Sequence, residues 1–341
     1  MRKLASIQQI NETRPIPDAD AIELAQVLGW QCVVKKGEFK AGDYCVYFEV
    51  DSFLPIEEKY EFLRKNCYRK NEFMGEGFRI KTISLRGEIS QGLLLPIGKF
   101  PALANKEVGD DVTDLLGVRK WELPEQAMSD GTAVGEKPYG IPTTDEVRIQ
   151  SAPELLAEFE GKPYYISTKM DGTSCTIYVK DGKVGVCGRN WEYKDDGKCS
   201  MWKWVHDMNL VDKLKELGQD IAIQGEFCGA GIQKNRLKLQ RPLIYVFTIL
   251  MLGDDNKTAR ASLDEMREFC NKLGLTTVPI EEEGESFGYT LPELLERARG
   301  KYASGMDKEG IVIRTATPGR LGYQALSFKV INNDFLKKEK D

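Results

Sequence analysis

The chain has 341 residues, of which 41% are hydrophobic and 30% charged, and its formal net charge is −5. This composition is typical of a globular protein and excludes an intrinsically disordered or a fibrous chain. The length favours two domains. No apolar run approaches the roughly 20 residues that cross a bilayer, and the start MRKLASIQQINE lacks the apolar core of a signal peptide, so we expect no membrane segment.

The cysteines and the histidine narrow the possible chemistry. None of the eight cysteines forms a CxxC pair, which removes the common zinc spacings. Reduced thiols in the cytoplasm, with the nucleus as the alternative, explain them more simply than a disulfide framework. The single histidine, His206, lies in an amphipathic helical stretch and is predicted to be a helix surface residue rather than part of a Ser-His-Asp or Cys-His site.

Residues 1–125 are rich in short β-type runs separated by turns. The runs cover residues 22–28, 31–34, 44–49, 78–82 and 92–96. Strands of this length and spacing predict a small β-barrel, for which an OB-type barrel fits the length, although composition does not choose it over other small barrels. Residues 129–143 are rich in glycine and proline, and we predict a linker over 126–144.

From residue 145 to the end, strands alternate with capped helices, which predicts an α+β domain with a mostly antiparallel sheet. Capping-box pairs occur at Ser151 with Glu154, Ser262 with Glu265 and Thr290 with Glu293, and a further helix is expected over 201–217. Strands are expected at 164–168, 174–180, 183–188, 221–228, 242–251, 309–315 and 325–331, with a hairpin turn at 181–182. The acidic run 281–285 is expected to be a solvated loop.

The segment 164–172, YYISTKMDG, places Lys169 at the end of an apolar strand, before a turn at Asp171 and Gly172. An ammonium is no nucleophile, and lowering a lysine pKa from ~10.4 to ~7.5 takes about 4 kcal/mol of differential interaction. Burial, neighbouring cations and a bound metal all act in that direction. Taken alone, the motif KxDG also fits an ordinary lysine beside a turn.

Other polar groups recur on or beside the later strands. They are the segments Gly188-Arg189-Asn190, Gln224-Gly225-Glu226-Phe227, Tyr245-Val246-Phe247, Lys308-Glu309-Gly310 with Arg314, and Ser327-Phe328-Lys329. Buried polar groups need partners, so these segments either form independent salt bridges or face a single groove.

Taken together, KMDG, the arginine at 189, GEF, YVF, KEGIVIR and SFK resemble the ordered motifs of ATP-dependent polynucleotide ligases and mRNA capping enzymes. The resemblance covers about residues 145–331, and the segment 144–150, TDEVRIQ, is more similar to RNA ligases than to DNA ligases. It implies a covalent nucleotidyltransferase that uses ATP and Mg²⁺ or Mn²⁺.

The resemblance implies that Lys169 attacks the α-phosphorus of ATP and becomes lysyl-adenylate. Asp171 and Glu309 would hold the metal, partly through waters. Glu226 would bind the ribose or help to position the hydrated metal.

For the rest of the nucleotide and the RNA, the resemblance implies that Phe247 stacks on adenine and that Arg189 contacts the ribose or the RNA 5′-phosphate. Lys329 would bind the α-phosphate, and Arg148 would orient the departing pyrophosphate.

Two departures from the family pattern are visible. Many members have a Lys-x-Lys pair in the last motif, but here Ser327 takes the first position, so that Lys329 acts alone or Arg314 or Arg320 substitutes. The chain also ends at Asp341, without room for the carboxy-terminal OB domain of DNA ligases and capping enzymes.

The amino-terminal part is expected to supply RNA contacts instead. Basic and aromatic residues interleave there, namely Phe62, Arg64, Lys65, Tyr68, Arg69, Lys70, Phe73, Phe78, Arg79, Lys81 and Arg86. This pattern resembles RNA ligases with an amino-terminal OB module, although a charged loop beside core aromatics would look the same. A second basic run over 234–241 is expected either to hold RNA or to be an exposed loop.

The sequence therefore predicts a monomeric RNA ligase for RNA repair that joins 3′-hydroxyl and 5′-phosphate ends, including those of nicked duplexes. The alternatives are DNA nick sealing or guanylyl transfer by the same chemistry, and a non-catalytic RNA-binding protein.

Overall fold

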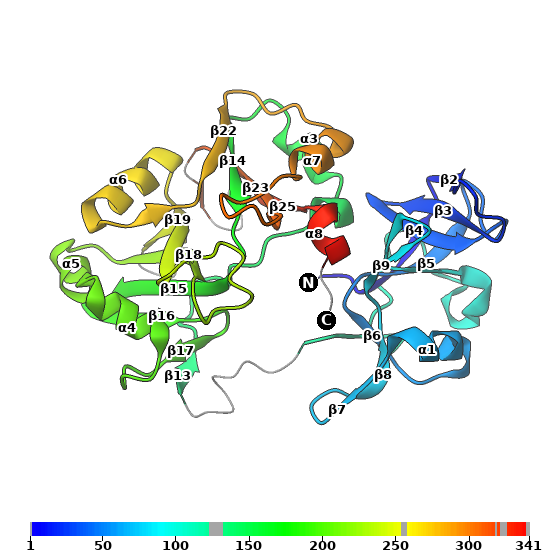
Figure 1. The fold of residues 1–341 in the computed structure, drawn as a ribbon, viewed down its shortest axis with the longest axis horizontal. Helices are drawn as coiled ribbons and strands as arrows, with labels where there is room; N and C mark the ends of the chain where they lie inside the picture. The colour runs from blue at the N-terminus through cyan, green and yellow to red at the C-terminus, as the bar shows by residue number, and fades with distance from the viewer. Residues whose placement is uncertain (1, 123–131, 254–257, 318, 321–325, 339–341) are drawn as a thin grey trace. The chain divides into compact units, whose positions relative to one another are not determined.

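The computed structural model describes residues 2–122, 132–253, 258–317, 319–320 and 326–338 (Figure 1). The chain divides into two compact units. Unit 1 comprises residues 1–124 with 150–153 and 336–341, and unit 2 comprises residues 125–149 and 154–335. No helix within the described residues has the length and apolarity needed to cross a membrane.

Unit 1 consists of short strands in separate antiparallel sheets, ordered β1-β5-β11, β2-β3-β4, β12-β6-β8-β7 and β10-β9. Its elements are β1 (Ala5–Gln9), β2 (Glu12–Pro15), β3 (Ile22–Val27), β4 (Trp30–Lys35), β5 (Tyr44–Phe48), β6 (Ser52–Leu54), η1 (Glu58–Leu63), α1 (Arg64–Cys67), β7 (Tyr68–Asn71), β8 (Gly75–Arg79), β9 (Thr82–Leu85), β10 (Glu88–Gln91), β11 (Leu93–Pro96), η2 (Ile97–Lys99), η3 (Pro101–Leu103) and β12 (Arg119–Lys120).

The strand β5 explains why unit 1 has two small cores. Val46 and Phe48 pack into one core, with Tyr60 and Phe78, whereas Cys45 and Tyr47 on the opposite face pack into another core, with Trp30. Because side chains alternate across a strand, a continuous apolar run such as that of β5 is the pattern of a strand covered on both faces.

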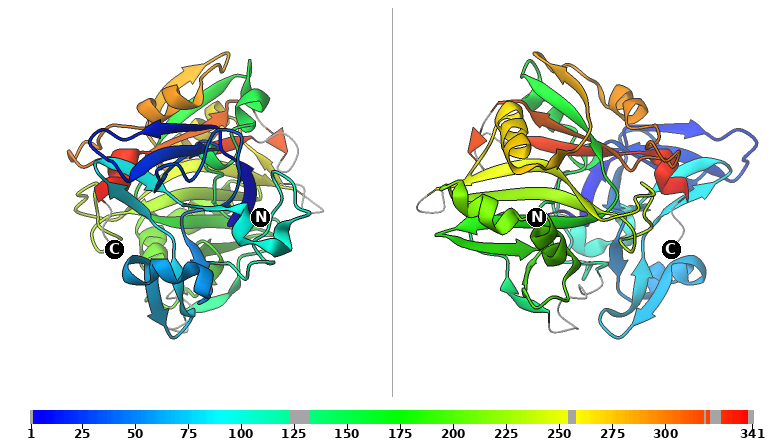
Figure 2. Two further views of the ribbon diagram at one scale, coloured as in Figure 1. Left: turned by 90° about the vertical axis from the view of Figure 1, so that its right-hand side faces the viewer. Right: turned by 60° about the vertical axis from the view of Figure 1, so that its left-hand side comes forward.

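The larger sheet of unit 2 has the order β13-β17-β16-β15-β18-β19-β20-β24, and β21 pairs with β19. Its strands are β13 (Ala133–Glu136), β15 (Thr173–Lys180), β16 (Lys183–Cys187), β17 (Trp191–Tyr193), β18 (Ile221–Cys228), β19 (Leu243–Leu252), β20 (Thr258–Arg260), β21 (Thr276–Thr277) and β24 (Gly319–Arg320). The helices α4 (Ser200–Asp207), α5 (Leu210–Glu216) and α6 (Leu263–Leu273) pack their apolar faces against one side of this sheet (Figures 1 and 2).

The smaller sheet of unit 2 has the order β22-β14-β23-β25. Its strands are β22 (Ile280–Gly284), β14 (Tyr164–Lys169), β23 (Gly310–Thr315) and β25 (Ser327–Ile331). One face packs Ile166, Ile311, Ile313 and Phe328 against α3 (Leu155–Phe159) and α7 (Leu291–Arg297). The remaining elements are η4 (Ile149–Ser151) and α8 (Asn333–Lys338).

The ladder register of this sheet places the predicted polar residues on its other face. Lys169 lies opposite Gly310, Ser167 opposite Val312, and Val312 opposite Lys329. Arg314 lies opposite Ser327. Directly opposed residues of an antiparallel pair point to the same side of the sheet, so these side chains share one face.

A β-bulge interrupts the pairing of β18 with β19. Gln224 lies opposite Thr248 but Gly225 lies opposite Val246, so that Phe247 is the additional residue. The apolar pattern changes phase there, because Ile244 and Val246 enter the core before the bulge and Ile249 enters it afterwards.

The prediction of a linker over 126–144 is wrong for residues 133–136, which form the strand β13 and pair with β17. The pairing register shifts between Ala133 and Gly135, and a glycine is well tolerated at such an edge irregularity. Residues 126–131 lie outside the described residues.

The helix predicted over 201–217 is two helices, because Asn209 takes a left-handed conformation with φ of 51° between them. The capping boxes of Ser262 and Thr290 are confirmed. That of Ser151 is wrong, since Ser151 lies in the 3₁₀ turn η4 and α3 has no side-chain cap.

The acidic run 281–285 is mostly strand β22 and not a solvated loop. Glu281 binds Lys308, Glu282 accepts hydrogen bonds from Tyr164 and Tyr289, and Glu283 pairs with Arg267. Partners from other segments compensate the carboxylates, which allows three consecutive glutamates to stay in a sheet.

Candidate active site

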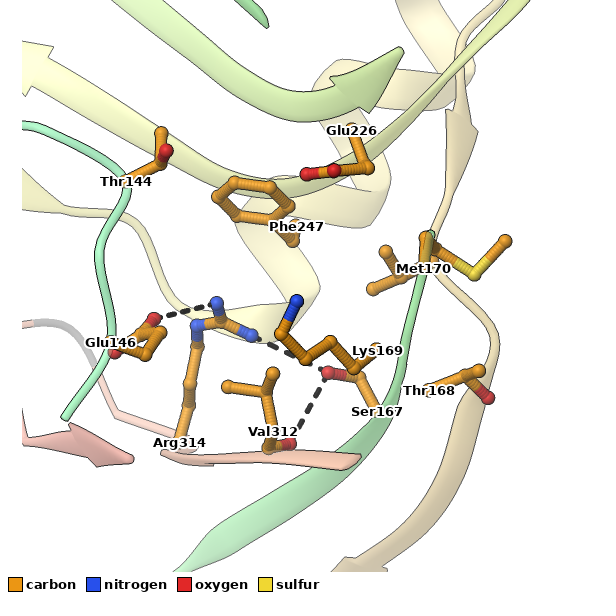
Figure 3. A pocket seen from close by; sticks show the side chains of 11 residues that line it. Thr144, Glu146, Ser167, Thr168, Lys169, Met170, Glu226, Phe247, Val312 and Arg314 are labelled. Carbon is orange, nitrogen blue, oxygen red and sulfur yellow. Dashed lines mark hydrogen bonds and ion pairs between the residues drawn. The ribbon is translucent and has the colours of Figure 1, made fainter. Parts of the chain in front are cut away.

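A hollow of about 390 Å³, open to solvent, lies within unit 2 between the two sheets (Figure 3). The smaller sheet contributes Ser167, Lys169, Val312 and Arg314, and the larger sheet contributes Glu226 and Phe247. The segment before η4 adds Thr144 and Glu146. Four of the segments singled out in the sequence therefore meet at a single groove, namely those of Lys169, Glu226, Phe247 and Arg314.

Lys169 is the last residue of β14, and its Nζ lies 2.6 Å from Oε2 of Glu309, the residue before β23. Burial lowers the pKa of Lys169, but the carboxylates of Glu309 and Glu226 outweigh it, so the net pKa is raised above the ordinary lysine value. The predicted depression of this pKa is therefore wrong for the protein alone, because two carboxylates flank the amine.

Glu226 and Asp171 complete an acidic cluster around this amine. Burial raises the pKa of Glu226 to about 7, Glu309 and Asp171 act in the same direction, and Lys169 opposes them. Asp171 pairs with Arg236, whose NH1 lies 2.7 Å from its Oδ2. Burial raises the pKa of the Cys228 thiol, and the negative charges of Glu226, Asp171 and Glu309 all raise it further.

Across the described part of the chain, no group of three or more histidine, cysteine, aspartate or glutamate side chains is arranged to hold a metal ion. Two of the three clustered carboxylates are instead held by cations of the chain itself, Lys169 and Arg236.

Phe247 and Arg314 contact each other in the lining of the hollow, with the guanidinium carbon 5.2 Å from the ring centroid. Arg314 is held by Glu146, 2.8 Å from its NH2, and by the hydroxyl of Ser167. Ser327, the first position of the last motif, donates a hydrogen bond to Glu146 at 2.5 Å. Of the two arginines expected to substitute for the missing lysine, Arg314 lines the hollow beside Ser327. The side chain of Arg320 lies outside the described residues.

Lys329 lies in β25 on the face that carries Lys169, and its backbone N–H donates to the carbonyl of Val147. The backbone of Arg148 forms a parallel bridge with that of Lys329. Burial lowers the pKa of Lys329 to about 8, and the positive charges of Lys169 and Arg148 add to the effect. Three cationic side chains, those of Lys169, Arg148 and Lys329, therefore lie near one another.

Replacing Lys329 with methionine is expected to raise the unfolding midpoint near pH 7. The pKa of Lys329 is about 8 in the folded protein against 10.5 for an ordinary lysine, so the folded state binds fewer protons between these values and wild-type stability rises with pH there. The advantage of Lys329→Met should therefore shrink from pH 8 to 10.5 in thermal unfolding. Lys203→Met, at an exposed position of α4, is the control. A gain independent of pH would contradict the explanation.

Arg189 lies outside the residues that line the hollow. Its guanidinium pairs with Asp145, with NH2 2.7 Å from Oδ2. The second basic run is not a uniform exposed patch, because Arg236 is only partly exposed, pairs with Asp171, and has its guanidinium carbon 4.3 Å from the ring centroid of Phe335. His206 is exposed on α4 and pairs with Asp195, which confirms the prediction of a helix surface residue.

Sequence reasoning gave no role to Glu146, although its segment had been singled out. It holds both Arg314 and Ser327, and the only available signal was an acidic residue two positions before Arg148. The link between Arg236 and Asp171 had no signal at all, because 65 residues separate them in the chain.

A family model described as an OB-fold domain matches residues 4–97, and a model described as RNA ligase matches residues 162–331. The comparison with curated proteins gives no match.

Among solved structures, the chain is similar to RNA ligase from Naegleria gruberi. A lysine-to-alanine variant with ATP and Mn is 37% identical, with 99% of each chain covered and a TM-score of 0.88. The protein with pyrophosphate is 37% identical, with 100% of each chain covered and a TM-score of 0.89. A lysine-to-methionine variant with AMP and Mn is 38% identical, with the same coverage and a TM-score of 0.89.

The OB-like character predicted for the amino-terminal part and the antiparallel sheets predicted after it are confirmed by these matches. With identity above one third over essentially the whole length of both chains, the chain belongs to the RNA ligase family.

Proposed function

We propose that this protein is an ATP-dependent RNA ligase that joins a 3′-hydroxyl to a 5′-phosphate through lysyl-AMP and RNA-adenylate intermediates. The observation that carries the proposal is the position of Lys169, whose amine faces Glu309 at 2.6 Å in the hollow that Phe247 lines. A lysine amine is the nucleophile of such a transfer, and the nitrogen–phosphorus bond that it forms replaces the bond to pyrophosphate.

The hollow suits an adenine nucleotide. Phe247 offers a ring face for the base, and Val312 and Met170 add apolar surface. Glu226 reaches the same space from β18 and fits a ribose hydroxyl (Figure 3). Lys329 and Arg148 supply positive charge for the phosphates, Lys329 at the α-phosphate and Arg148 at the departing pyrophosphate.

The acidic cluster suits Mg²⁺ or Mn²⁺. Its donors are the oxygens of Asp171, Glu226 and Glu309, and hard cations of this kind take one or two carboxylates together with waters and phosphate. Burial is the main cause of the raised pKa of Glu226, and the neighbouring carboxylates of Glu309 and Asp171 add to it, so a bound cation would lower this pKa. When bound, the metal would neutralise phosphate charge and weaken the effect of the carboxylates on the pKa of Lys169.

We propose two domains along the chain, an OB-like domain over residues 1–125 and an adenylyltransferase domain over residues 145–341. The OB-like domain, which corresponds to unit 1, is proposed to bind the RNA. Phe62 and Phe73 are exposed, at 59% and 61%, and offer faces for base stacking. Lys81 lies near Arg69 and Arg79, whose charges join burial in lowering its pKa. Phe78, by contrast, is a core residue. Arg189 is proposed to contact the ribose or the RNA 5′-phosphate.

For its setting, we propose a monomer that acts in RNA repair in the cytoplasm, with the nucleus as the alternative. The eight cysteines are all unbonded, which suits a reducing compartment. Sealing of a nicked duplex is the substrate arrangement that we expect.

The decisive experiment incubates the protein with labelled ATP and Mg²⁺ or Mn²⁺ and looks for a covalent protein adduct. GTP in place of ATP tests guanylyl transfer, and a panel of RNA and DNA nicks tests the substrate. We expect an adduct with ATP and sealing of RNA. An adduct with GTP, or sealing of DNA alone, would favour the alternatives, and RNA binding without any adduct would favour a non-catalytic protein.

A further inference from the structure

We infer that the loop 301–307 braces the active site and that Tyr302 is a positioning residue for Lys169 and Glu309. The inference rests on the proposed function. The loop lies between α7 and β23, and neither the family motifs nor the predicted site residues include it.

The Tyr302 hydroxyl joins the main chains of the two strands that carry the nucleophile and its carboxylate partner. It donates a hydrogen bond to the carbonyl of Lys169 at 2.6 Å and accepts one from the N–H of Glu309 at 3.0 Å. These contacts lie where the ladder between β14 and β23 ends, since Lys169 and Gly310 are its last pair. One buried hydroxyl thus holds the backbones from which the Lys169 amine and the Glu309 carboxylate extend.

A second tie joins the residues just before these two. Glu281 accepts hydrogen bonds from the hydroxyl of Thr168 and from Nζ of Lys308, both at 2.7 Å. With Tyr302 acting on residues 169 and 309 and Glu281 on residues 168 and 308, the spacing of the two segments is fixed by two independent bridges.

The loop also reaches the third member of the acidic cluster. The hydroxyl of Ser304 donates to the carbonyl of Arg236 at 2.5 Å, and the guanidinium of Arg236 pairs with Asp171. The loop itself is closed by backbone bonds from Tyr302 to the carbonyl of Met306 and from Gly305 to the carbonyl of Tyr302. A rigid loop therefore connects to Lys169, Glu309 and, through Arg236, to Asp171.

The Tyr302 ring packs with Met170, Cys228 and Val278, so Tyr302→Phe keeps this packing and removes only the hydroxyl. Misplacing reacting groups by about 1 Å can cost roughly 100-fold in rate. We therefore expect Tyr302→Phe to slow formation of the lysine adduct about 10-fold or more, with little change in the KM for ATP. Sealing of pre-adenylylated RNA should be reduced less, because that step does not use the Lys169 amine as a nucleophile.

A readout without ligands tests the brace directly. In Tyr302→Phe the N–H of Glu309 loses its acceptor, so amide hydrogen exchange around residues 301–309 should accelerate while the core of β18 and β19 stays protected. Tyr289→Phe is the matched control, since its hydroxyl donates to the side chain of Glu282 on the edge strand β22 and contacts neither Lys169 nor Glu309 in the described structure, so it should leave adduct formation unchanged.

Three results would overturn the inference: a wild-type rate of adduct formation in Tyr302→Phe, an equal loss in both steps, or unchanged exchange at Glu309. If Tyr302→Phe does not fold, Ser304→Ala decides, because selective slowing of adduct formation supports the brace and a wild-type rate refutes it. Absence of an adduct in the wild-type protein would instead remove the proposed function, and the inference with it.

Discussion

Replacing Lys169 with alanine is expected to abolish the covalent adduct with AMP completely. Among the described residues that line the hollow, Lys169 is the only lysine. Its Nζ lies 2.6 Å from the carboxylate of Glu309, and Glu226 lines the same hollow. Lys169→Arg should fail as well, because a guanidinium keeps its proton and is a poor nucleophile at any pH that the protein tolerates. Adduct formation with labelled ATP, followed on denaturing gels, measures both.

Lys183→Ala provides the control for a lost lysine on a strand of the larger sheet, since Lys183 is two-thirds exposed and pairs with Glu192 away from the hollow. It should form adduct at the wild-type rate. An adduct in Lys169→Ala, mapped by mass spectrometry to Lys329 or any other residue, would refute the assignment of the nucleophile.

Replacing Gly310 with alanine is expected to destabilise the protein by about 3 kcal/mol or more. Gly310 has φ of 151°, and an added Cβ would lie 2.1 Å from the carbonyl oxygen of Val330, a backbone atom in the middle of a paired strand. Relief requires that β23 and β25 move apart next to Glu309, so adduct formation should fall together with stability. Chemical denaturation and the adduct assay measure the two effects.

Gly161→Ala separates the collision from backbone strain. Gly161 also has a positive φ, of 72°, but no atom lies within 4 Å of its added Cβ, and the expected cost is about 1 kcal/mol. Equal destabilisation by the two substitutions would show that the close contact with Val330 is not the cause.

Much of the site was predictable because its residues are spaced two positions apart along strands, as side chains on one face of a strand are. Ser327 and Lys329 alternate with buried residues in β25, and Ser167 and Lys169 likewise lie two positions apart in β14, so that the spacing puts each pair on one face of the sheet. The hydrophobic strands themselves were recognisable from their β-branched runs. The order of the motifs then related strands that are far apart in the sequence.

What could not be predicted depends on contacts between distant segments. Tyr302 looks like any core aromatic after a helix, and its role arises only because its hydroxyl reaches residues 169 and 309. The strand β22 was missed because three glutamates suggest solvent, whereas Arg267 and Lys308 come from other elements to compensate them. The raised pKa of Lys169 likewise follows from Glu309, 140 positions further along the chain.

The additional residue at Phe247 contributes to the hollow but is not needed for the alternation of β19. Phe247 lines the hollow, and because it is the additional residue, Val246 before it and Ile249 after it both enter the core. Without this residue, β19 would alternate regularly and would still direct Val246 and Ile249 into the core, so its loss should leave the sheet intact. Relatives that lack a residue here are therefore expected to keep the fold but to lack the aromatic ring that lines the hollow.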